Sequence, residues 1–247
     1  MLLLILTCST HVFGASLRVV TENWPPYNYE KNGQAVGLVT EVVRATLDRA
    51  GVDYTIEVLP WARAYRLARQ EPNVLIYSMY KLPEREEMFQ WIAMDGLNVD
   101  TYIMRPKTRN DIRINTLEEA KAYRIGVTRD AAPHLFLLKH GFVEGKQIFP
   151  VCNELFNILK SQPQNDRIDL TTCDLLSQIY RLQEAGIASD YWVPVLPLLS
   201  ENLYMAFSLE TDKKMVDRIS NAFGQIRQEG ILETMVQKYR KMLEQNP

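Results

Sequence analysis

Motifs that carry out catalysis or hold metals are absent from this sequence, and binding is the chemistry that remains. The chain has no G-x-x-x-x-G-K-[ST] phosphate loop, no G-x-S-x-G nucleophile turn and no H-E-x-x-H zinc motif. After an apolar N-terminal run, the remaining histidines and cysteines are His134, His140, Cys152 and Cys173, and they lack metal-ligand spacing. We therefore expect no catalytic residue, no metal, no cofactor and no enzyme activity.

Short apolar strands alternate with amphipathic helices, and these elements must position any binding site. Strands are predicted over 17–20, 54–59 and 74–79, with helices over 38–50 and 60–69 between them. This order is typical of a parallel sheet in an α/β protein. A second unit of the same kind follows Pro106. Its predicted helices cover 117–122, 133–140, 154–161 and 175–185, and its strands 124–127, 148–151 and 168–172. The chain closes with a strand over 203–208 and helices over 213–229 and 231–243.

Composition limits the possible partners. The 247 residues include 28 Lys+Arg and 30 Asp+Glu, which gives a formal net charge of −2. Such a chain has no basic field to hold a phosphate backbone, so we expect no nucleic acid partner. The hydrophobic fraction of 47% is that of an ordinary globular protein, and we expect a monomer.

The N-terminal segment has the pattern of a secretion signal. An apolar run from Leu2 to Phe13 ends in the small residues Gly14-Ala15-Ser16, and it is too short to cross a bilayer. We expect residues 1–15 to be a cleaved signal peptide and the mature protein to be periplasmic. A buried strand, or a recorded start that lies downstream of the true one, would also fit. In an oxidising compartment Cys152 and Cys173 could form a disulfide, and two buried thiols are the alternative.

Ordered motifs along most of the chain resemble the bacterial extracellular solute-binding proteins of family 3, the periplasmic amino-acid-binding type. No single motif is diagnostic, but their order from Leu17 to Tyr239 is specific. They are Thr21-Glu22-Asn23-Trp24-Pro25-Pro26-Tyr27, Gly33-x-x-x-Gly37-Leu38, Leu82-Pro83-Glu84-Arg85 before Phe89, Arg124-Ile125-Gly126-Val127, Asp166-Arg167-Ile168-Asp169 before Asp174, Leu203-Tyr204-Met205-Ala206-Phe207-Ser208 and Gly230-x-x-x-x-Met235.

The resemblance implies a type II periplasmic-binding-protein fold, with two α/β lobes, two hinge crossings and a ligand cleft between the lobes. Residues 16–104 and 203–247 would form lobe 1 and residues 105–202 lobe 2, with crossings near 102–106 and 201–203. The implied function is capture of a small polar solute, an amino acid or related carboxylate, by lobe closure for the membrane permease of an ABC importer. A sensor that presents its closed form to a membrane receptor is one alternative. An enzyme of the cyclohexadienyl-dehydratase type on the same fold is another, with Glu22 or Asp174 as general acid.

The same resemblance assigns ligand-binding roles. Arg85 matches the arginine that grips the ligand carboxylate, a task that suits the guanidinium fork, and an exposed charge is the alternative. Asp174 matches the acid that faces the ligand ammonium, although it could simply cap the helix that follows. Three further matches are Glu22 at the cleft mouth, Trp24 as an aromatic cover, and Trp61 as a cleft residue or a helix anchor.

Two further residues match ligand-contacting positions of the family, and one segment differs from the family pattern. Ser78 and Tyr80 match positions that meet the ligand, with strand packing as the alternative. Family members that bind amino acids carry Gly-Ser or Gly-Thr at the first helix of lobe 2, whereas this chain has Asp130-Ala131 and no hydroxyl there. An acid at that place would repel a carboxylate, and we expect Arg129 to compensate for it. Asp169 is expected to have a structural role.

Overall fold

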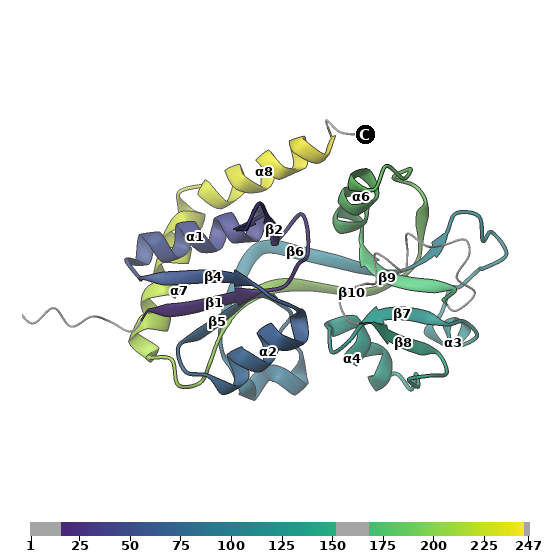
Figure 1. Ribbon diagram of the computed structural model, residues 1–247, viewed down its shortest axis with the longest axis horizontal. Helices are drawn as coiled ribbons and strands as arrows, with labels where there is room; N and C mark the ends of the chain where they lie inside the picture. Colours follow the sequence, from purple (N-terminus) through teal and green to yellow (C-terminus); the bar gives the residue numbers. More distant parts are fainter. Residues whose placement is uncertain (1–15, 152–167, 245–247) are drawn as a thin grey trace, which may run out of the picture.

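The computed structural model describes residues 16–151 and 168–244 (Figure 1). Its strands form one eight-stranded sheet in the order β4-β1-β5-β10-β6-β9-β7-β8, and a two-stranded β2–β3 hairpin stands apart. The strands are β1 Leu17–Thr21, β2 Tyr29–Lys31, β3 Gln34–Val36, β4 Tyr54–Val58, β5 Val74–Met79, β6 Gln90–Pro106, β7 Ile125–Thr128, β8 Ile148–Val151, β9 Leu170–Asp174 and β10 Trp192–Phe207. The helices are α1 Leu38–Ala50, α2 Trp61–Gln70, α3 Leu117–Ala120, α4 Ala132–Lys139, α6 Leu175–Glu184, α7 Lys213–Gln228 and α8 Ile231–Glu244, with a 3-10 helix at Pro83–Met88.

Lobe 1 contains β1 to β5, α1, α2, α7 and α8, together with the adjoining ends of β6 and β10 (Figure 1). Strand β1 lies between β4 and β5 and is parallel to both, as the strand–helix order predicts. Alternate residues of a strand face opposite sides of a sheet. Leu17 and Val19 therefore pack with α1 and α7, whereas Val20 packs with α2 through Trp61 and Ala64. Both faces of this sheet are covered, which explains its continuous apolar strands.

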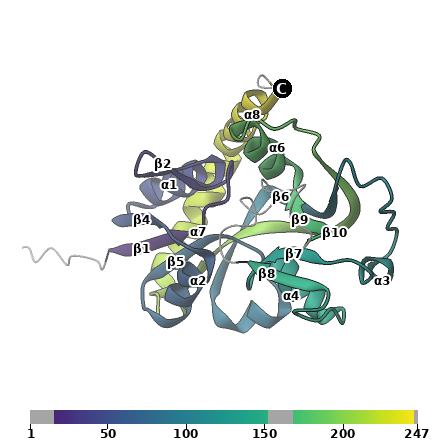
Figure 2. The same cartoon turned by 45° about the vertical axis from the view of Figure 1, so that its right-hand side comes forward.

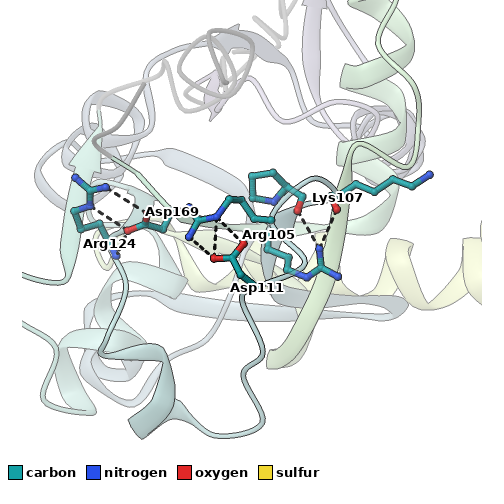
Figure 3. A network of polar contacts seen from close by, with 7 residues as sticks. Arg105, Lys107, Asp111, Arg124 and Asp169 are labelled. Atoms are coloured by element: carbon teal, nitrogen blue, oxygen red, sulfur yellow. Dashed lines mark hydrogen bonds and ion pairs between the residues drawn. The ribbon is translucent and has the colours of Figure 1, made fainter. Parts of the chain in front are cut away.

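Lobe 2 contains β7, β8 and β9 with α3, α4 and α6, and it has a separate apolar core that includes Ile125, Leu137 and Leu170. Asp169 ties the starts of β7 and β9 together. Its carboxylate accepts hydrogen bonds from the backbone N–H and from Nε of Arg124, both at 3.0 Å. Figure 3 shows this pair within a network that also holds Arg105, Lys107 and Asp111. Asp169 therefore has the structural role expected for it.

The lobes are joined by β6 and β10, which pair antiparallel from Gln90–Phe207 to Pro106–Trp192 (Figures 1 and 2). Register shifts interrupt this pairing, and the largest leaves residues 94–97 of β6 unpaired with β10. On the lobe 1 side β10 also pairs with β5, and on the lobe 2 side β6 also pairs with β9 from Thr101 to Met104. Between these regions only residues 98–100 and 200–202 continue the sheet. The first crossing thus comes a few residues before the segment 102–106 in which it was expected, because that segment is already occupied in pairing with β9.

Most of the predicted helices and strands are present, with ends that match or shift by one or two residues. The exception is the strand expected over 203–208, which is only the end of β10, a strand that begins at Trp192. Gly51 ends α1 in the left-handed conformation, at φ 60°. The β2–β3 hairpin turns at Asn32-Gly33. The predicted helix 154–161, the signal segment 1–15 and Cys152 lie outside the described residues. In the described part of the chain no helix has the length and apolar character needed to cross a membrane.

Candidate ligand-binding site

A cavity of about 420 Å³ lies between the two lobes. Lobe 1 supplies the loop after β1, the end of β4 with the start of α2, and the loop after β5. Lobe 2 supplies the ends of β7 and β9 and the first turns of α4 and α6. Seven of the eight residues expected to bind the ligand line this cavity, namely Glu22, Trp24, Trp61, Ser78, Tyr80, Arg85 and Asp174.

The loop after β1 carries Trp24 to the cavity and is held in place by helix α1. Backbone N–H groups of Leu38 and Val39 donate to the carbonyl oxygens of Pro26 and Tyr27 at 3.0 and 2.8 Å. These are N–H groups of the first helical turn, which have no partner within the helix itself. The close approach requires glycine at position 37, where a Cβ would lie 2.4 Å from the Tyr27 oxygen and φ is +117°. The Gly33-x-x-x-Gly37 spacing in the sequence therefore serves to dock this loop.

Asp174 caps a helix, which is one of the two roles that the sequence suggested, and it also lies in the cavity wall. It is buried, and its Oδ1 accepts from the backbone N–H of Ser177 at 2.9 Å, which caps helix α6. The same carboxylate accepts from Trp24 Nε1 at 2.9 Å and from the hydroxyl of Tyr27 at 3.1 Å. Trp24 and Tyr27 belong to lobe 1, so these two hydrogen bonds cross the cleft.

Arg85 is buried and lies between aromatic rings. Its guanidinium carbon is 5.2 Å from the ring centroid of Trp61 and 5.1 Å from that of Tyr65, distances suited to cation–π attraction. Nη2 donates to the backbone oxygen of Asp130, in lobe 2, at 2.7 Å. Nε is buried without a hydrogen-bond partner among the described residues. Burial lowers the pKa of Arg85 from its ordinary value, and the unsatisfied donor is the type of group that a ligand oxygen would complete.

Glu22 stands in the cavity wall with its carboxylate unbonded. Within the described residues its backbone oxygen accepts from Asn28, but no hydrogen bond reaches its side chain. Removal of the carboxyl group from water raises the pKa of Glu22 to about 7, while the positive charges of Arg181 and Arg85 oppose this shift. The cavity therefore holds a carboxyl group that burial shifts toward its protonated form.

Ser78 and Tyr80 extend the cavity wall from the end of β5. Ser78 has a left-handed backbone, at φ 62°, and its hydroxyl donates to Asn28 Oδ1 at 2.5 Å. The hydroxyl of Tyr80 lies 3.3 Å from Thr101 Oγ1, across to β6. Left-handed conformation in a non-glycine residue is strained and often found at functional sites. Here it coincides with an irregularity in the sheet, because β10 pairs with Tyr77 and Met79 and skips Ser78.

Arg129 is the expected residue that the structure does not bring to the cavity. Its Nη1 lies 3.6 Å from Glu144 Oε2, and neither residue is part of the cavity lining. Arg85 contacts Asp130 through the backbone oxygen, to which its Nη2 donates at 2.7 Å. The turn is held by His134, a buried histidine whose Nδ1 accepts from the Asp130 N–H at 3.0 Å.

Several site residues were missed by the sequence analysis. Tyr27 was read only as part of a motif, although its hydroxyl reaches Asp174. Arg181 on α6 lines the cavity and donates to the backbone oxygen of Asn23 at 2.9 Å. Tyr65 was expected to pack at the start of α2, and its ring also contacts the guanidinium group of Arg85. Cys173 also lines the cavity, and burial raises the pKa of its thiol to about 12.

Comparison with solved structures supports the fold class. A histidine kinase sensor domain with similarity to periplasmic binding proteins superposes with a TM-score of 0.79 at 17% identity, covering 91% of this chain and 96% of the other. The arginine-, lysine-, histidine-binding protein ArtJ from Geobacillus stearothermophilus gives 0.74 at 16% identity, covering 91% and 94%. A substrate-binding protein of an ABC uptake transporter from Streptococcus pneumoniae, with bound histidine, gives 0.75 at 18%, covering 91% and 92%. The chain thus has the type II periplasmic-binding-protein fold.

Comparison with sequences gives the family. No curated protein sequence matches the chain significantly. The model of the bacterial extracellular solute-binding proteins, family 3, matches residues 17–242, which is nearly all of the chain after the N-terminal apolar run. The chain therefore belongs to the bacterial extracellular solute-binding proteins of family 3.

Proposed function

We propose that this protein captures a small solute with both a carboxylate and a cationic group, an amino acid or a close relative, in the cleft between its lobes. One observation carries the proposal: Arg85, with an unsatisfied Nε, and Glu22, with an unbonded carboxylate, face the same interlobe cavity. A group of either charge is costly to leave buried without a partner. A ligand with complementary charges at its two ends would satisfy both.

Arg85 is the proposed carboxylate receptor and Glu22 the proposed receptor for the cation. Trp61 and Tyr65 fix the orientation of the guanidinium by stacking on it, so less freedom is lost when a ligand binds. Trp24, Trp61 and Tyr80 supply aromatic wall for the apolar part of the ligand. Ser78 shapes the edge of the cavity from the end of β5. The similarity to proteins described as binding arginine, lysine or histidine supports a basic amino acid as the first ligand to test.

Closure would occur as a rotation of two lobes about β6 and β10. We propose to move the expected division, residues 16–104 with 203–247 and residues 105–202, so that the bend lies at residues 98–100 and 200–202, because residues 101–104 pair with β9 of lobe 2. Only two strands continue the sheet there. Ala132, Leu135 and Leu176 of lobe 2 pack with the lobe 1 core, so rotation would have to separate these apolar contacts.

The proposed compartment is the periplasm, and the proposed partner is the permease of an ABC importer. The likeness to a histidine kinase sensor domain supports a second candidate, in which the closed form signals to a membrane receptor. Genes for a permease and an ATPase beside this one would favour import, and a kinase gene would favour sensing.

Thermal unfolding of refolded protein, measured with basic, neutral and acidic amino acids and with simple carboxylates, tests the binding function. A ligand that binds only the folded state raises the unfolding temperature, and the gain in stability grows with the logarithm of the ligand concentration relative to Kd. We expect arginine, lysine or histidine to stabilise the protein and Glu22→Gln to reduce that response. Glu210→Gln, on the exposed surface, is the matched control. A folded protein that responds to no compound in the panel would contradict the proposal.

A further inference from the structure

Asp174 already has hydrogen-bond donors for both of its carboxylate oxygens. Oδ1 accepts from the Ser177 backbone N–H at 2.9 Å and from the Tyr27 hydroxyl at 3.1 Å, and Oδ2 accepts from Trp24 Nε1 at 2.9 Å. Two or three such bonds are enough to stabilise an ionised carboxylate away from water. Asp174 is 4% exposed and has this support from neutral groups of the protein itself. It therefore does not need a ligand ammonium as its partner.

Other contacts between groups of the protein also connect lobe 1 with lobe 2. Arg85 Nη2 donates to the Asp130 backbone oxygen at 2.7 Å, and Arg181 donates to the Asn23 backbone oxygen at 2.9 Å. The rings of Tyr29 and Tyr180 face each other across the lobes with centroids 5.4 Å apart. These contacts join the same two lobes as the Trp24–Asp174 bond. Several hydrogen bonds and a ring contact between protein groups thus hold the two lobes together.

The cation-receiving acid must then be the one that remains unbonded. Glu22 lines the cavity with no side-chain hydrogen bond from the described residues, whereas each oxygen of Asp174 has at least one. A cation prefers the carboxylate with open acceptor positions over one whose donors it would have to displace.

We propose that Trp24, Tyr27 and Asp174 form an interlobe latch that closes the cleft without ligand, so that the solute needs a carboxylate for Arg85 and a cation for Glu22 but no α-ammonium group. The ligand class widens from α-amino acids to carboxylates with a distant cationic group. The ligand part of this proposal rests on the proposed binding function, whereas the latch part does not.

Small-angle X-ray scattering of refolded, ligand-free protein tests the latch. We expect the wild-type profile to match the closed structure and the double variant Trp24→Phe/Tyr27→Phe to have a larger radius of gyration. That double variant leaves the Ser177 cap of α6 intact. Asp174→Ala should open the cleft as well, and Asp212→Ala, which removes the equivalent cap from α7, should not. A wild-type protein as open as the double variant would overturn the latch.

Calorimetric titration with matched ligands tests the ligand class. L-arginine carries all three groups, 5-guanidinopentanoate lacks the α-ammonium and agmatine lacks the carboxylate. We expect 5-guanidinopentanoate to bind within about threefold of L-arginine and agmatine to bind at least 100-fold more weakly. A loss of 100-fold or more for 5-guanidinopentanoate, with Asp174→Asn abolishing L-arginine binding, would overturn the inference. Binding of none of the three, with the ligand-free protein still closed, would leave the latch standing and count against both the ligand class and the proposed function.

Discussion

The indole Nε1 of Trp24 lies 2.9 Å from Oδ2 of Asp174, although 150 residues separate the two positions. Trp24 follows the first strand of lobe 1, and Asp174 stands where β9 of lobe 2 passes into α6. Trp24 lies three residues beyond the end of β1 and Asp174 is the last residue of β9, so both are at the carboxyl end of a strand, which is where α/β proteins place their binding residues. The bond shows that the two lobes meet through the residues that the sequence singled out.

Binding of a cationic ligand should weaken as the pH falls below 7. Glu22 in the ligand-free cavity has a pKa raised to about 7 by burial, and a cation pairs only with its ionised form. Guanidinium groups stay charged throughout this range. Calorimetric titration of L-arginine between pH 5.5 and 8.5 should show affinity falling by up to tenfold per pH unit below 7, with proton release on binding near pH 7. Glu22→Gln should bind more weakly and without this pH dependence. If the affinity of the wild type did not change with pH, the cationic group of the ligand would not pair with Glu22.

The ligand-free protein should lose stability as the pH rises from about 4 to 7. An unfolded glutamate ionises near pH 4.3, whereas Glu22 in the folded protein ionises near 7, so the folded state binds more protons between these values. The free energy of unfolding should therefore drop across this window, by about 2 kcal/mol after allowance for solvent screening in the cavity. Urea unfolding at pH 5 and pH 8 measures this difference. Glu22→Gln should lack most of it, and Glu210→Gln should keep it.

Arg85→Lys should keep the protein folded and lose affinity for carboxylates. Lysine preserves the charge but has neither the planar fork nor the flat face that stacks between Trp61 and Tyr65. We expect affinity for the best carboxylate ligand to fall by roughly 10- to 100-fold, about 2 kcal/mol. Titration calorimetry gives the change, and a melting curve confirms folding. Arg113→Lys, on the exposed surface, should bind as the wild type does. Unchanged affinity in Arg85→Lys would mean that Arg85 serves only to hold Asp130.

Gly37→Ala should disturb the cleft from a position outside it. A methyl group there would lie 2.4 Å from the Tyr27 backbone oxygen, and the backbone has φ +117°. We expect a loss of about 3 kcal/mol in stability, together with weaker binding, because the loop that carries Trp24 must move. Gly33→Ala is the matched control, with φ +75° and no atom within 4 Å of the added carbon, and should cost about 1 kcal/mol. Equal losses in the two variants would show that the loop tolerates the displacement.

The sequence could predict the strands and helices of lobe 1 because their apolar periodicity is strong. Strand β1 and helix α1 have buried faces that follow from Leu17, Val19, Val42 and Leu47. Long strands β6 and β10 were read as extended crossings, since Asp95, Gly96 and three prolines interrupt any simple alternation. Their pairing with each other comes from tertiary contacts that join positions about 100 residues apart.

The candidate site was predictable by residue type but not by partner. Arg85 and Asp174 both line the cavity, as expected. Trp24 and Tyr27 donate hydrogen bonds to Asp174 only because of the way the two lobes meet. Local sequence patterns do not encode that arrangement. Arg129 was expected in the cleft because it is next to Asp130 in the sequence, but its side chain lies beside Glu144 and does not line the cavity. A position next to a cavity residue in the sequence therefore did not predict that the side chain reaches the cavity.

The pairing of Pro106 with Trp192 at the lobe 2 end of β6 and β10 has a consequence for the order of folding. It closes the intervening chain into one long loop whose ends are held side by side, so lobe 2 can assemble from contiguous chain. Lobe 1 needs β10 beside β5 and α7 beside α1, which joins the two ends of the sequence. During synthesis from the N-terminus, lobe 2 is therefore complete before lobe 1 has all its parts. The emerging β1 to β5 must wait, with apolar faces uncovered, for the last fifth of the chain.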